Sequence, residues 1–169
     1  MANLSLTRVN QKLAQARLLI VGVDEESLAA VHRNSLMEAA AFHLICAYQH
    51  YLRELAEAYG LKPVIDVRTE VDLATAFEAA KKHPAEADEL LVLRNDSHSW
   101  LFRLQGYYES LWHAPKPSNS QSNDQSNDNL ISSVNLDVIA DLISMENLRE
   151  WHSDFVALVM RQRETSAEF

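Results

Sequence analysis

Residues 37–55 decide the fold, and their central ten residues, 39–48, read AAAFHLICAY with His43 as the one polar side chain. A helix on the surface of a protein has a polar face, whereas this run has none. We therefore predict that it is a helix surrounded by other helices, at the centre of an all-α, single-domain bundle. Such a helix is compatible with almost any biochemistry, so the run predicts architecture and no activity.

Length and composition favour one helical domain spanning residues 1–169. A chain of this size can bury a core without disulfides or structural metal. Three glycines and four prolines are too few for a fold of many tight hairpins. Lys and Arg number 15 against 24 Asp and Glu, which gives a net charge of −9. Because the basic residues are not clustered, we expect neither nucleic acid nor a membrane among the partners.

The single cysteine and the N-terminus both favour a cytoplasmic protein. Cys46 is the only cysteine, which excludes an intramolecular disulfide and any multi-cysteine zinc site. The N-terminal sequence MANLSLTR has no basic segment leading into an apolar core, and the apolar run at 18–23 is far shorter than the ~18 residues that span a bilayer. The chain also has no glycine-rich phosphate loop, and we expect no cofactor.

The spacing of apolar residues predicts four main helices and one or two short ones. We predict helices over 6–23, 27–59 and 69–81, from Pro84 to a polar break at 95–97, through the aromatic stretch 100–112, and from Ser144 onward. Residues 64–67 are apolar enough for a strand, but they have no partner strand, so we predict a loop there.

A low-complexity segment precedes the last predicted helix. Residues 118–129 are only Ser, Asn, Gln and Asp, and QSND occurs twice, at 121–124 and 125–128. Such a segment buries nothing apolar and cannot offset the entropy lost on ordering. We predict a disordered polar loop over 114–134.

Two histidines and two aromatic residues are candidate ligand contacts. His43 and His50 lie seven residues apart on one stripe of the second predicted helix, where they could hold a small ligand or, with other histidines, a metal ion. No Glu is followed three residues later by His, as a ferritin-like carboxylate site requires, and we assign no metal site. Trp100 and Tyr108 could line a pocket. The alternative is that these histidines and aromatic residues belong to the core.

Arg94 and His98 flank the predicted helix break at 95–97. The segment RNDSH resembles the arginine-to-histidine motif of HEPN ribonucleases, which are helical bundles, usually dimeric, that cut RNA without metal. The resemblance implies that His98 is the acid-base group and that Arg94 binds phosphate. The two residues have three others between them, fewer than in that family, and the net charge argues against RNA. The alternative is ordinary capping of a helix end.

Several longer segments resemble a family of short uncharacterised proteobacterial proteins. They are RVNQKL at 8–13, AFHL at 41–44 continuing to LRELA at 52–56, SWL at 99–101, and residues 151–163. The resemblance spans most of the chain except the polar loop. It implies an all-helical bacterial cytosolic protein and adds no known activity.

The sequence favours a non-catalytic interaction or regulatory bundle that self-associates. The apolar stripe of the first helix and the aromatic residues at 100–112 supply more apolar surface than one small core needs. The expected partner is a second copy of the chain or another protein. The alternatives are a dimeric HEPN-like ribonuclease and a histidine-based bundle that binds a metal or a small ligand.

Overall fold

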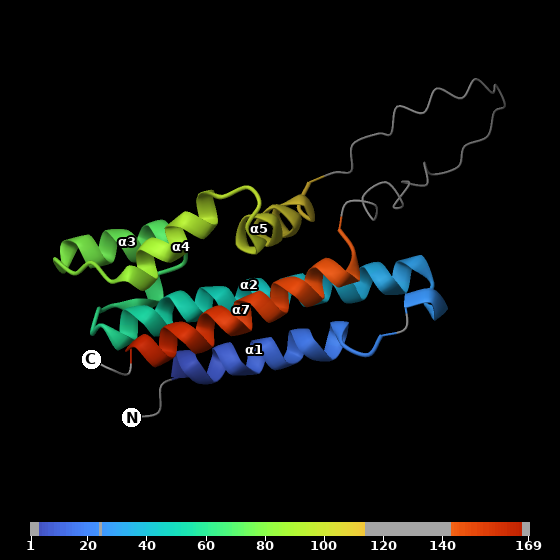
Figure 1. Ribbon diagram of the computed structural model, residues 1–169, viewed down its shortest axis with the longest axis horizontal. Helices are drawn as coiled ribbons and strands as arrows, with labels where there is room; N and C mark the ends of the chain where they lie inside the picture. The colour runs from blue at the N-terminus through green and yellow to red at the C-terminus, as the bar shows by residue number, and fades with distance from the viewer. Residues whose placement is uncertain (1–3, 24, 114–142, 167–169) are drawn as a thin grey trace, which may run out of the picture.

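The computed structural model describes residues 4–23, 25–113 and 143–166, and in these ranges it contains α-helices and no strand (Figure 1). Three helices are long: α1 (Leu4–Ile20), α2 (Ala30–Ala58) and α7 (Met145–Ser166). Three are short: α3 (Glu70–Ala79), α4 (Ala85–Asn95) and α5 (Trp100–Ser110). The prediction of an all-helical chain is confirmed, whereas the division into four main helices is not. The loop predicted over 114–134 lies outside the described residues.

The three long helices lie side by side, and the short helices cover one face of them (Figure 1). α1 runs antiparallel to α2, and α7 runs parallel to α2, so α1 and α7 are antiparallel to each other. α3 and α5 pack on the side of α2 that lies opposite to α1. None of the described helices is both long and apolar enough to cross a membrane. One side of the layer of long helices is therefore covered by the short helices, and the other side is not.

α2 forms the centre of the core because its small and apolar residues face several neighbours. Ala40, Leu44 and Ala47 are fully buried, and the small size of the two alanines lets a neighbouring helix approach closely. Phe42 is the one exposed side chain of the run 39–48. The apolar run predicts the buried position of this helix correctly, although one edge of it meets solvent.

Two of the three short helices, α3 and α5, begin at side chains that cap them. Thr69 Oγ1 accepts a hydrogen bond from the Asp72 amide while the Asp72 carboxylate accepts one from the Thr69 amide, so α3 begins with a reciprocal capping box. Ser99 Oγ accepts from the Phe102 amide and starts α5. The predicted break at 95–97 is confirmed, since α4 ends at Asn95. These caps fix the positions of the first residues of α3 and α5.

α7 is held against the other long helices by polar contacts at both of its ends. Near its start, Arg149 Nε donates to the carbonyl oxygen of Ile20 at 2.9 Å. Near its end, Tyr51 Oη donates to Gln162 Oε1 at 2.6 Å, and Arg163 binds the buried Glu54 carboxylate through Nε at 2.7 Å and Nη2 at 2.8 Å. The helix is thereby aligned along its whole length with α1 and α2.

Candidate functional site

A polar pocket of about 370 Å³ lies where α2, α4 and α5 meet the start of α3. Its polar lining combines three hydroxyls, two guanidinium groups, two carboxylates and two amides, contributed by Tyr48, Tyr108, Thr69, Arg68, Arg94, Glu70, Glu109, Gln49 and Gln105. The volume is within the range of small-molecule sites. Because four separate elements contribute, the pocket exists only in the folded bundle.

Glu70 places a carboxylate at the buried side of the pocket. It is the first residue of α3, where the positive end of the helix dipole favours an anion, and it is 5% exposed. Gln105 Nε2 on α5 donates a hydrogen bond to Glu70 Oε1 at 2.7 Å. A neutral amide is thus the hydrogen-bond donor to this carboxylate in the described structure.

Two buried polar atoms of the lining have no hydrogen-bond partner. They are Tyr48 Oη and Gln105 Oε1, and they make up two of the three such side-chain atoms in the described ranges. The donation from Gln105 to Glu70 fixes the amide so that its oxygen points away from the carboxylate. Buried polar atoms are nearly always paired in proteins, so two unpaired atoms in one pocket indicate a place for a molecule that supplies the missing bonds.

The charged groups of the pocket differ in exposure. Burial, and next the nearby Glu70 carboxylate, raise the pKa of Tyr48 well above its ordinary value of 10, while Arg94 acts in the opposite direction. The Tyr48 hydroxyl is therefore neutral and can donate or accept. Arg68 is exposed at the rim, and Arg94 is half-buried with its guanidinium 5.9 Å from the centre of the Phe102 ring. The exposed Glu109 lines the pocket as well, so the accessible part of the lining carries charges of both signs.

Comparison with known proteins gives a family for the whole chain. A family model described as a family of unknown function, DUF6586, matches residues 1–169. The chain belongs to DUF6586. This confirms the predicted similarity to an uncharacterised family. No curated protein and no solved structure matches the chain, so the similarity to HEPN ribonucleases rests on the motif alone.

The pocket of this DUF6586 protein brings together two of the residues predicted from sequence, Arg94 and Tyr108. Trp100 does not line the pocket, and its ring is stacked on the Phe155 ring with the ring centres 5.1 Å apart. The His98 side chain is 94% exposed, with Nδ1 3.5 Å from Asp96 Oδ1, and it does not line the pocket. The assignment of Arg94 and His98 to a nuclease site stays a prediction.

His43 and His50 lie on α2 outside the pocket. Lys12 Nζ lies 3.4 Å from His43 Nδ1, and burial, followed by the Lys12 charge, lowers the pKa of His43. Burial, followed by Arg53 and other cations, lowers the pKa of His50. Both rings are therefore neutral near pH 7. Within the described ranges, no group of three or more His, Cys, Asp or Glu side chains could hold a metal ion.

The residues that sequence reasoning missed are those buried by tertiary contact. Glu70 follows Thr69 at a predicted helix start, where an acidic residue is expected for the helix dipole alone. Gln105 lies in an aromatic helix with no local sign of a buried partner. Nothing in the spacing of DUF6586 residues 69–81 and 100–112 indicates that the starts of these helices meet, so no signal in this sequence could have found the pair.

Proposed function

We propose that this DUF6586 protein is a non-catalytic binding module whose polar pocket holds a small organic molecule that carries N–H donors, such as an amine, a guanidine or an amino acid. The observation that carries the proposal is the coincidence, in one pocket, of the buried Glu70 carboxylate with the unpaired atoms Tyr48 Oη and Gln105 Oε1. The proposal develops the ligand-binding alternative from the sequence, with Glu70 and Gln105 in place of the histidines.

The chemistry of the lining selects for a donor-rich ligand. Gln105 Oε1 can only accept hydrogen bonds, and the ionised Glu70 carboxylate can only accept them as well. A cationic N–H group satisfies both and compensates the charge of a carboxylate whose neighbours include the neutral Gln105 amide and the neutral Tyr48 hydroxyl. Arg94 and Arg68 also line the pocket and can bind a carboxylate on the same molecule, while Glu109 can accept a further N–H donor. An amino-acid-like zwitterion therefore matches more of the lining than a simple amine does.

The lining supports binding more than catalysis. Among its described residues are no histidine, cysteine or serine, so the usual pairs of a nucleophile and a base are missing there. The hydroxyl of Thr69 already takes part in the capping box. The Tyr48 hydroxyl, with its raised pKa, is a poor base near neutral pH. These groups can recognise a ligand without transforming it.

The test is a thermal-shift and calorimetric screen of the full chain with a panel of primary amines, guanidines and α-amino acids. We expect at least one compound of these classes to raise Tm in the wild type. Glu70→Gln keeps an oxygen that can accept from Gln105 but removes the charge, so it should weaken binding by at least about tenfold. Glu78→Gln, on the exposed side of the same helix, is the matched control and should bind normally.

Two results contradict the proposal. One is a panel in which none of the amines, guanidines and amino acids raises Tm or gives heat of binding. The other is a compound that binds Glu70→Gln and Glu78→Gln as tightly as it binds the wild type, because its site is then elsewhere.

We also propose that the protein is bacterial, works in the cytoplasm and forms a homodimer. The cytoplasmic location is supported by the single thiol, Cys46, whose pKa is raised by burial, which makes it poorly reactive. Fractionation of cells that express the full chain tests the location, and recovery with membranes or in the periplasm would contradict it. The homodimer is supported by a surface that is described next.

A further inference from the structure

A second concavity lies between α1 and α7, and all of its lining residues come from these two helices. It is a groove of about 550 Å³ whose apolar lining comes from Leu13, Ala14, Val156, Val159 and Met160. The ligand pocket shares none of its lining residues. This groove and the helix surfaces beside it are called the α1–α7 face below.

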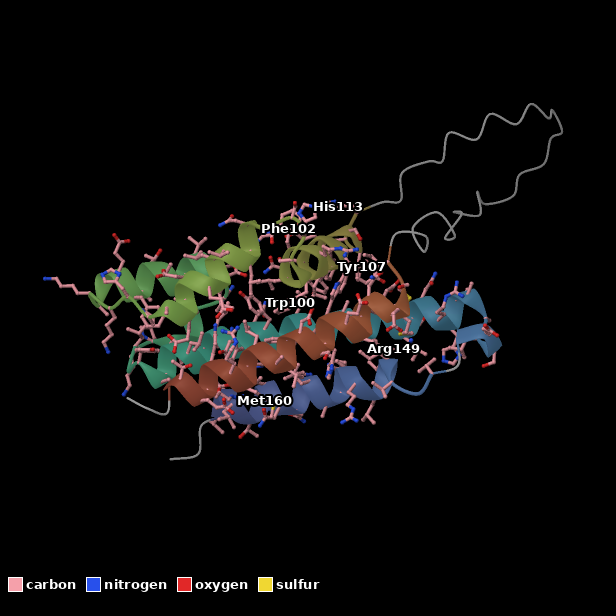
Figure 2. The ribbon with its side chains drawn as sticks, viewed as in Figure 1. Trp100, Phe102, Tyr107, His113, Arg149 and Met160 are labelled. Carbon is pink, nitrogen blue, oxygen red and sulfur yellow. The ribbon has the colours of Figure 1, made fainter. Side chains whose placement is uncertain are left out.

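The α1–α7 face leaves large apolar side chains in solvent. Leu18 on α1 is 81% exposed, and Met160 on α7 is 62% exposed (Figure 2). Val21, which directly follows α1, is exposed as well. Single exposed apolar residues are ordinary, but here they border one groove that is itself apolar. The face is therefore a candidate for burial against another helix surface.

The two helices of this face carry opposite charges. α1 contains three basic residues, Arg8, Lys12 and Arg17, and no acidic residue, although the whole chain has a net charge of −9. The Arg17 side chain makes no ion pair with any described residue. α1 thus presents a positive surface in an acidic protein.

α7 presents the complementary negative charges. Its basic residues are already paired: Arg149 with Glu146, Arg161 with Glu89 and Arg163 with Glu54. Its remaining acidic residues, Glu150, Asp154 and Glu164, make no ion pair with described residues. Glu150 and Glu164 stand three and four residues from the groove residues Ser153 and Met160, which are neighbouring positions on a helix, whereas Asp154 does not border the groove. Across the described part of the chain, this face therefore carries the unpaired Arg17 on one helix and the unpaired Glu150 and Glu164 beside the groove on the other.

We propose that the α1–α7 face binds a second copy of the same chain, so that two α1 and two α7 helices form a four-helix layer between the subunits. A twofold interface must be complementary to itself, and a face that is positive on one helix and negative on the other meets this condition. Around a twofold axis that runs along the helices, α1 of one copy lies against α7 of the other. The apolar groove is then filled by the exposed side chains of the second copy.

The contacts between α1 and α7 indicate which charges meet. His152 Nε2 lies 3.1 Å from the Leu13 carbonyl oxygen, and Arg149 Nε lies 2.9 Å from the Ile20 carbonyl oxygen. Arg17 falls between these two α1 residues, and Glu150 falls between Arg149 and His152. A rotation about an axis along the helices preserves this level, so Arg17 of one copy comes to the same level as Glu150 of the second copy.

The first test measures the mass of the full chain by sedimentation velocity over a range of concentrations. We expect a dimer of twice 19.1 kDa for the wild type. Leu18→Glu places a charge in the apolar layer and should raise the dimer Kd by at least about tenfold. Val92→Glu changes a 67% exposed apolar residue on α4 and should leave Kd unchanged. A monomeric wild type, or equal effects of the two variants, overturns the proposal.

The second test exchanges the charges. Arg17→Glu and Glu150→Arg each place like charges together in their own homodimer, so each variant alone should be more monomeric than the wild type. In a heterodimer of the two variants, position 17 of each chain meets the opposite charge at position 150 of the other chain, and a 1:1 mixture should recover the dimer. Circular dichroism confirms that both variants are folded. Failure of the mixture to recover the dimer overturns the arrangement, since unfolding cannot explain it.

Discussion

Gln105 on α5 donates a 2.7 Å hydrogen bond to the Glu70 carboxylate at the first residue of α3. The two residues are 35 positions apart, and neither helix contributes a salt-bridge partner to this carboxylate within the described residues. A buried anion whose hydrogen-bond donor is one neutral amide is sensitive to any change in that amide. This relationship links the stability of the bundle to the occupancy of the pocket.

Gln105→Leu should destabilise the ligand-free protein by about 1.5 to 3 kcal/mol, because a buried carboxylate then loses its hydrogen-bond donor. Urea unfolding followed by circular dichroism measures the change. Gln49→Leu is the control, since Gln49 borders the same pocket but is exposed and makes no side-chain hydrogen bond to described residues. Equal free energies of unfolding for the two variants would show that the bond to Glu70 contributes nothing.

Two buried tyrosines on α2 should respond differently to the loss of their hydroxyls. Tyr51 Oη donates to Gln162 Oε1, and Tyr51→Phe should lower the free energy of unfolding by about 1 to 2 kcal/mol. Tyr48 Oη has no partner at hydrogen-bonding geometry among the described residues, so Tyr48→Phe should change it by about 0.5 kcal/mol or less. Urea titrations of the two variants side by side test the contrast. A larger cost at Tyr48 would mean that its hydroxyl is already satisfied.

Arg163→Leu should be among the most destabilising changes in α7. It leaves the buried Glu54 carboxylate without its two-point partner, which costs about 3 kcal/mol, at the low end for buried pairs because Arg163 is partly exposed. The double variant Glu54→Leu, Arg163→Leu should recover most of the loss. A double-mutant cycle from thermal or urea unfolding measures the coupling, and additive single effects would mean that the pair is not coupled.

Stability should fall as the pH drops below about 6.5. Burial and Lys12 hold the pKa of His43 below its ordinary value of 6.5 in the folded protein. The unfolded chain therefore binds more protons in this window, and the free energy of unfolding decreases as the pH falls from 6.5 toward the folded-state pKa. His43→Asn keeps an acceptor for Lys12 but does not titrate.

The measurement compares urea unfolding of the wild type and of His43→Asn at about pH 7.5 and about pH 5. On going from the higher to the lower pH, the variant should lose less free energy of unfolding than the wild type. Its loss should not fall to zero, because the pKa of His50 is also lowered in the folded protein. Identical losses for the two proteins would exclude a contribution from His43.

The sequence predicts those parts of the fold that depend on local chemistry. The predicted helices over 69–81 and 100–112, the break at 95–97 and the buried run at 39–48 each depend on side chains close to the backbone that they affect. The predicted aromatic residue Trp100 is a core residue, because its ring stacks on Phe155 from a distant part of the chain.

The candidate site depends on contacts that no local pattern encodes. Arg94 and Tyr108 are predicted from their chemical types, and the structure brings both to one pocket. Glu70 and Gln105 become significant only when α5 lies over the start of α3. The unpaired state of Gln105 Oε1 follows from this tertiary bond, since an exposed amide would be satisfied by water.

The docking of α7 has a consequence for how the protein can be divided. Its polar contacts reach residues far away in sequence, such as Ile20 at 129 positions from Arg149 and Glu54 at 109 positions from Arg163. These bonds and the apolar contacts of Phe155 hold the helix in place without help from the covalent connection. Two separately expressed pieces, 1–113 and 143–169, should therefore reassemble into one particle, which makes this chain a scaffold for fragment complementation.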